Sequence, residues 1–148
     1  MRYSRPAVMG IINATPDSFH AASRACTEAE VAGRAERMAA EGADMLDVGA
    51  CSTRPGASAP DASTEWARLE PALRAVRKAV GEDMPVSVDT FRAEVARRAV
   101  ESGMADIVND IGGGTLDAAM FDTVAGLRVP YVLMHMRGTP ADMQTRTD

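Results

Sequence analysis

Polar side chains stand at the ends of five short apolar runs, and their types are suited to binding a small polar ligand. The residues are Asn13, Asp47, Asp89, Asn109 and His135. Helix N-caps also prefer Asp and Asn, so each position taken singly has an ordinary structural explanation. Asn or Asp at four successive strand ends is better explained by one shared site, because functional groups gather where parallel strands end.

The alternation of side chains along a strand divides these residues into two sets. Successive side chains of a strand point to opposite faces of the sheet. On that basis Asp89, Asn109 and Met134 are predicted to point into the site. Asp110 and His135 are predicted to point away from it, in supporting or structural roles.

The predicted inward residues suit a particular class of ligand. A carboxylate beside a carboxamide offers acceptors and a donor to a heterocycle that carries amino and ring N–H groups. Met134 and Ile111 are suited to packing on a flat ring. In the segment 51–56, Thr53 supplies a hydroxyl and Arg54 a guanidinium that can grip phosphate or carboxylate with two hydrogen bonds. The alternative for Arg54 is a surface salt bridge.

The elements that would position these residues alternate regularly between strand and helix. Strands are predicted at Ala7–Ile12, Met45–Val48, Val86–Val88, Ile107–Val108 and Tyr131–Met134. Helices are predicted from the capping box at Thr27 to a stop at Gly42, over Ser63–Val80 with Pro71 dividing it, from near Thr90 to Gly103, and over Asp117–Ala125 before Gly126. Such alternation predicts right-handed crossovers and a parallel sheet.

Two parallel α/β architectures compete for this pattern. A doubly wound dinucleotide-binding sheet would have a glycine-rich first turn, whereas this chain has NATPDS there, so that fold is disfavoured. A (β/α)₈ TIM barrel needs about 250 residues. We therefore expect residues 1–148 to form a single domain that supplies about the first five strands and four helices of such a barrel.

Composition and charge limit the function further. The 148 residues are 46% hydrophobic and 25% charged, with a net charge of −5, which is typical of a globular protein and disfavours nucleic-acid or membrane partners. No apolar run reaches the length of a membrane span, and the polar residues from Asn13 onward argue against a signal peptide. Cys26 and Cys51 do not form a disulfide or metal-site pattern, so a cytoplasmic location is expected.

Four stretches, in order, resemble the dihydropteroate synthase family of folate biosynthesis. They are VMGIINATPDSF, GADMLDVGACSTRPGA, PVSVDTFRAEVARRAVESGMADIVNDIGGG and PYVLMHMRGTP. The resemblance implies a (β/α)₈ barrel, a homodimer and a sulfonamide target. It also implies a Mg²⁺-assisted condensation of p-aminobenzoate with 6-hydroxymethyl-7,8-dihydropterin diphosphate, releasing pyrophosphate. No general base is assigned for this reaction.

The resemblance also implies roles for individual residues. Asn13 would help to hold Mg²⁺ and pyrophosphate, and Asp89 and Asn109 would hydrogen-bond the pterin edge. The other residues implied are Thr53 and Arg54, in a loop over pyrophosphate and p-aminobenzoate, with Asp47 beneath that loop, and Ile111 and Met134, which would line the pterin faces. Catalytic roles would fall to Asn13, Thr53, Arg54 and Asp89.

Three departures from the family pattern leave alternatives open. The first loop reads His20-Ala21-Ala22-Ser23 where the family has an acidic residue and glycines, and Cys51 replaces a Glu. The family's later motifs have no counterpart before Asp148, so we expect the 148-residue chain alone to be inactive and poorly soluble. A non-catalytic pterin-binding module and a methyltetrahydrofolate-dependent methyltransferase domain are the alternative functions.

Overall fold

The computed structural model describes residues 4–14, 28–50 and 60–135, and these form one parallel sheet with four helices. The strands are β1 (Met9–Asn13), β2 (Met45–Gly49), β3 (Val86–Asp89), β4 (Ile107–Asp110) and β5 (Tyr131–Leu133). The helices are α1 (Glu28–Ala40), α2 (Ala62–Val80), α3 (Ala93–Glu101) and α4 (Met120–Leu127).

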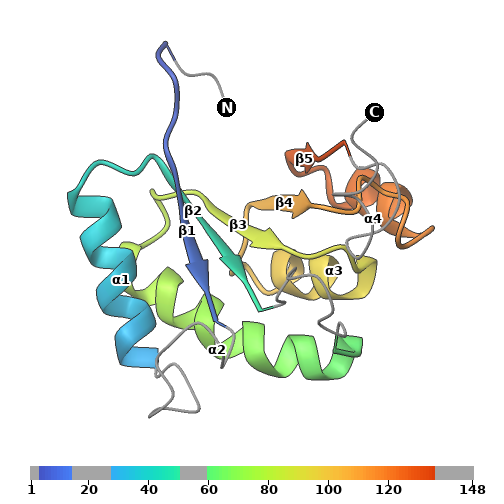
Figure 1. The fold of residues 1–148 in the computed structure, drawn as a ribbon, viewed down its shortest axis with the longest axis horizontal. Coiled ribbons are helices and arrows are strands. Elements are labelled where there is room, and N and C mark those ends of the chain that lie inside the picture. Colours follow the sequence, from blue (N-terminus) through green and yellow to red (C-terminus); the bar gives the residue numbers. More distant parts are fainter. Residues whose placement is uncertain (1–3, 15–27, 51–59, 136–148) are drawn as a thin grey trace, which may run out of the picture.

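The strands lie in the sheet in the same order as in the sequence, β1-β2-β3-β4-β5, and every neighbouring pair is parallel. Figure 1 shows the helices following the sheet from α1, near β1, to α4, near β5. A doubly wound sheet would reverse its strand order at one point, and this sheet does not. Sequential parallel order is the arrangement of a barrel wall, as predicted.

The helices cover one face of the sheet, and the core lies between the two. Ile12, Leu46 and Val48 are fully buried on that face, whereas Ile11, which precedes Ile12, is 62% exposed. Alternation along the strands therefore divides the sheet into a buried outer face against the helices and an open inner face. The helices contribute Val31, Leu69, Leu73, Val95 and Met120 to the same core.

Glycines end two of the helices as predicted. The amides of Gly42 and Ala43 bond to the carbonyls of Ala39 and Met38, a Schellman motif with φ of 100° at Gly42. Gly103, with φ of 72°, ends α3 with the same pair of bonds. The predicted capping box at Thr27 lies outside the described residues.

Two helix predictions were wrong. Pro71 does not divide α2, which runs unbroken over 19 residues. Buried Leu69 and Ala72 on either side of it anchor both parts of the helix, so the loss of one backbone hydrogen bond at proline is tolerated. Gly126 does not end α4. That helix continues to Leu127, and Arg128 adopts the left-handed conformation (φ 57°) at its end.

The remaining boundaries shift by one to three residues. Asn13 and Asp110 belong to strands β1 and β4 rather than following them, and Met134 follows β5. α3 begins at Ala93 rather than near Thr90 because the preceding residues turn around Thr90, whose hydroxyl accepts a hydrogen bond from the Arg92 amide at 3.1 Å. Phe91 consequently lies before the helix, with the Arg92 guanidinium 4.5 Å from its ring.

Candidate functional site

One row of residues crosses the whole sheet at the carboxyl ends of the strands. The register pairs Asn13 with Gly49, Gly49 with Asp89, Asp89 with Asn109, and Asn109 with Val132. Residues paired in a parallel sheet point to the same face, and Ile11, two residues before Asn13, marks that face as the open inner one. The sheet therefore brings the side chains of Asn13, Asp89 and Asn109 to the inner face, at one end.

Glycine in this row leaves room for the Asp89 carboxylate. A Cβ atom added at Gly49 would lie 3.0 Å from Asp89 Oδ2, closer than nearly all ordinary contacts of such atoms. Asp89 itself is half-buried between β2 and β4. A side chain at position 49 would push the Asp89 carboxylate away, so the glycine maintains the space that this carboxylate occupies.

Burial and neighbouring negative charge raise the proton affinity of Asp89. Burial, followed by the negative charges of Asp47, Glu65 and Asp110, raises the pKa of the Asp89 carboxyl to about 7. Near neutral pH this group can therefore either donate or accept a hydrogen bond. Such versatility suits recognition of a heterocycle edge that carries both N–H groups and ring nitrogens.

A direct hydrogen bond joins Asn109 to Asp47, which lies deeper on the same inner face. Asn109 Nδ2 donates to Asp47 Oδ2 at 3.0 Å. Asp47 is only 3% exposed and pairs in register with Ile11 and Ser87, one step deeper on the same inner face. The prediction that Asp47 stands at a strand end was wrong, because β2 continues to Gly49. Asp47 lies two residues before the end of its strand, as Ser87 does, and this spacing could have indicated the inner face.

Asp110 points away from the row, and its carboxylate organises the loop after β4. Its oxygens accept hydrogen bonds from the amides of Gly112 (2.7 Å) and Gly114 (2.8 Å) and from the Tyr131 hydroxyl (2.6 Å). Burial and the bond to Asp110 raise the pKa of Tyr131 above its usual range. The predicted split between Asn109 and Asp110 therefore agrees with their contacts.

The same loop joins β4 to the end of β5. The amide of Met134 donates to the carbonyl of Asp110 at 3.2 Å. Gly113 has φ of 57°, and a Cβ there would lie 2.5 Å from the Met134 carbonyl oxygen. Ile111 and Met134 are both half-buried, whereas His135 is exposed. Their predicted packing on a ligand ring stays a prediction.

A buried charge network supports the turn after Asp89, and sequence reasoning missed it. Glu65 of α2 is fully buried, accepts the Thr90 hydroxyl at 2.6 Å and pairs with the Arg92 guanidinium. Arg92 also donates to the Pro60 carbonyl, and the Thr90 amide donates to the Asn109 carbonyl at 3.0 Å. Helical spacing around Glu65 resembles that of any amphipathic helix, so no sequence signal distinguished it.

Thr53 and Arg54 lie outside the described residues, as do Cys51 and the segment 20–23. The described part of the chain holds no group of three His, Cys, Asp or Glu residues that could bind a metal ion by themselves. No helix in that part is long and apolar enough to cross a membrane.

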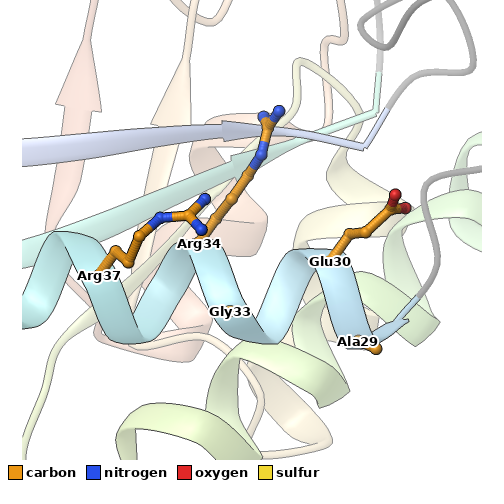
Figure 2. Close-up of a pocket in the computed structure, with 5 residues that line it drawn as sticks. All are labelled: Ala29, Glu30, Gly33, Arg34 and Arg37. Carbon is orange, nitrogen blue, oxygen red and sulfur yellow. The ribbon is translucent and has the colours of Figure 1, made fainter.

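A separate hollow of about 280 Å³ lies on α1 (Figure 2). It is lined by Ala29, Glu30, Gly33, Arg34 and Arg37, whose charged side chains leave the same side of the helix. The hollow shares no residue with the row at the strand ends. The strand-end row, with its buried carboxylates and amide, is therefore the candidate functional site.

A parallel sheet in sequential order, with polar side chains converging at the carboxyl ends of its strands, defines an α/β protein of the barrel class with a strand-end ligand site. Within that class the comparison with known families is specific. Residues 9–148 match the family described as pterin binding enzyme, and the chain belongs to that family.

Curated relatives cover nearly all of the chain. The mitochondrial folate synthesis bifunctional protein of Pisum sativum is 50% identical over 141 residues, which are 95% of this chain and 27% of that protein. The dihydropteroate synthase of Synechocystis is 42% identical over 144 residues, 97% of this chain and 49% of that protein. The chain thus spans about a quarter to a half of the length of these relatives.

Solved structures of dihydropteroate synthases likewise match most of this chain and about half of their own length. The dihydropteroate synthase of Xanthomonas albilineans with 4-aminobenzoic acid is 44% identical, with a TM-score of 0.77 over 91% of this chain and 48% of that one. The same enzyme with 7,8-dihydropteroate gives 41% identity and a TM-score of 0.73 over 90% and 47%. These enzymes are TIM barrels, so the five strands and four helices described here are part of such a barrel, as predicted.

Proposed function

We propose that the protein acts in dihydropteroate synthesis, joining p-aminobenzoate to 6-hydroxymethyl-7,8-dihydropterin diphosphate with release of pyrophosphate. The observation that carries the proposal is the inner-face row in which Asp89 and Asn109 stand side by side. Similarity to enzymes solved with 4-aminobenzoic acid and with 7,8-dihydropteroate supports it, because one is a substrate and the other the product of this reaction.

Binding and orientation are the main contributions of the described residues. Asp89 and Asn109 would hold the pterin edge through their donors and acceptors, with Ile111 and Met134 against its faces. This fixes the methylene carbon that bears the diphosphate. The arylamine nitrogen then needs only to be placed in line with that carbon, and its proton is lost after the C–N bond forms. No side chain is assigned as general base.

The leaving diphosphate requires positive charge near the strand ends. Mg²⁺ would supply charge neutralisation there. Asn13 fits such a role because its side chain is exposed at the end of β1, in the row with Asp89, and carries a hard oxygen ligand. With no three-carboxylate cluster among the described residues, substrate phosphates and water would complete the coordination. Thr53 and Arg54 are proposed to contact pyrophosphate and p-aminobenzoate.

Homodimer formation and a cytoplasmic location stay predictions. The charge and fold of the chain are compatible with both, although two plant relatives carry a mitochondrial designation. No nucleic-acid or membrane partner is proposed.

Growth of a synthase-deficient bacterial strain tests the proposal. The complete reading frame that carries these residues is expected to restore growth without added folate end products, and an Asp89→Ala variant is not. Failure of the wild-type protein to restore growth despite soluble expression would refute the activity. Calorimetry with the pterin diphosphate then separates the alternatives, since binding without turnover would indicate a pterin-binding module. Methyl transfer from methyltetrahydrofolate would indicate a methyltransferase instead.

A further inference from the structure

The Asn109 carboxamide has a defined orientation. Its Nδ2 atom donates to Asp47 Oδ2 at 3.0 Å. An ionised carboxylate can only accept hydrogen bonds, so the nitrogen and not the oxygen of the amide must face Asp47. The amide oxygen of Asn109 therefore points away from Asp47, and the second N–H of the amide is left for another partner.

Asp47 lies too deep to belong to the strand-end row itself. It is 3% exposed and occupies the row of Ile11 and Ser87, one step below Gly49, Asp89 and Asn109 on the inner face. Only one of its oxygens has a hydrogen-bond partner among the described residues, and that partner is Asn109. A buried carboxylate on an open face, bonded to a single side chain of the candidate site, points to a role exercised through that side chain.

We propose that Asp47 is a positioning residue that fixes the amide of Asn109, so that Asn109 presents one acceptor and one donor in a set order to the pterin edge. The inference rests on the proposed function. Without Asp47 the amide can rotate by half a turn and exchange its oxygen and nitrogen. The exchanged amide would meet the ligand's donors with a donor and its acceptors with an acceptor, leaving polar groups unpaired.

Two substitutions separate the hydrogen bond from the charge of Asp47. Asp47→Ala removes the acceptor, and Asp47→Asn removes the charge but keeps an oxygen that can accept the Asn109 N–H. Asp47→Leu fills a similar volume without an acceptor, and it replaces Asp47→Ala if the alanine protein does not fold. Ser87→Ala is the matched control, since Ser87 is buried beside Asp47 in register and its hydroxyl makes no hydrogen bond within the described chain.

The measurements are the KM values for both substrates and calorimetric binding of 6-hydroxymethyl-7,8-dihydropterin diphosphate, made on the complete protein. Asp47→Ala is expected to weaken pterin binding and raise the pterin KM by about tenfold to a hundredfold, the value of a hydrogen bond to a charged group. The KM for p-aminobenzoate should change by less than about threefold. Asp47→Asn should retain most of the affinity, and Ser87→Ala all of it.

A double variant gives the decisive comparison. If Asp47 acts through Asn109, adding Asp47→Ala to Asn109→Ala will cost little further pterin affinity. Additive losses, or an equal rise in both KM values, would overturn the proposal while leaving the proposed function intact. A wild-type protein that does not bind the pterin diphosphate would instead refute the proposed function.

Discussion

Asp89 connects the candidate site to the stability of the protein. Its folded-state pKa of about 7 lies well above the ordinary value of 3.8 because the carboxyl is buried and faces the charges of Asp47, Glu65 and Asp110. Between these two values the folded protein holds a proton that the unfolded chain releases. The contribution of Asp89 to stability is therefore fully present below about pH 4 and is lost as the pH rises through its folded-state pKa of about 7.

Asp89→Asn is expected to remove most of this pH dependence, because the amide stays neutral throughout. The variant should be more stable than the wild type at pH 8 by up to about 4 kcal/mol and no more stable near pH 4. Urea unfolding at both pH values measures the difference. Asp83→Asn, in an exposed turn, serves as the control and should leave the profile unchanged. Parallel pH profiles for Asp89→Asn and wild type would contradict the assignment.

At the scale of elements, the ion pair between Glu65 and Arg92 links α2 to the turn between β3 and α3. Glu65 is fully buried and Arg92 is 18% exposed, whereas the Glu94–Arg98 pair within α3 is about half exposed at both ends. Removing one partner of a buried pair leaves the other charge without compensation, and an exposed pair contributes little.

Glu65→Gln is therefore expected to lower the free energy of unfolding by about 3 kcal/mol, and Glu94→Gln by less than about 0.5 kcal/mol. Chemical denaturation of the two proteins under the same conditions tests this. Similar small effects at both positions would show that the buried Glu65–Arg92 pair contributes no more to stability than the exposed Glu94–Arg98 pair. Raised salt should weaken the exposed pair more than the buried one.

The glycines after β4 allow a second comparison between elements. Gly113 has positive φ and sits against the Met134 carbonyl, whereas Gly126 lies within α4 with open space around it. Gly113→Ala should destabilise the protein by more than about 2 kcal/mol, through strain and a backbone clash. Gly126→Ala should stabilise it by about 0.5–1 kcal/mol because alanine favours the helix. Thermal unfolding of both variants shows whether the opposite signs are observed.

The sequence predicted the elements better than their boundaries, for physical reasons visible at particular residues. Strand–helix alternation and the glycines at 42 and 103 reflect local preferences, and these predictions were confirmed. Pro71 was misjudged because buried Leu69 and Ala72 hold α2 together on both sides of it. Gly126 was misjudged because Arg128, and not the glycine, adopts the left-handed conformation that ends α4. Alternation placed Asp89 and Asn109 on one face. The Asp47–Asn109 bond and the burial of Glu65 depend on contacts between distant segments, which no local pattern contains.

At the scale of the whole molecule, the open inner face is the main departure from an ordinary globular surface. Ile11 is 62% and Val132 42% exposed on that face, and β1 and β5 are edge strands of the described sheet. Exposed apolar strands with unpaired edges favour self-association. A closed barrel removes both features, because its strands pair all round and its interior is filled.

We therefore expect the 148-residue polypeptide, expressed on its own, to bind the dye ANS, to self-associate and to show no synthase activity. The paired substitution Ile11→Gln and Val132→Gln should reduce dye binding and aggregation, because it removes apolar surface from the inner face. Val8→Gln is the matched control, since Val8 is 54% exposed but precedes β1 and lies outside the sheet. Size-exclusion chromatography and dye fluorescence measure both effects.

If the Val8→Gln protein improved as much as the paired variant, self-association would arise from general surface hydrophobicity rather than from the inner face. A monomeric polypeptide that turned over both substrates would show that these five strands suffice for the reaction.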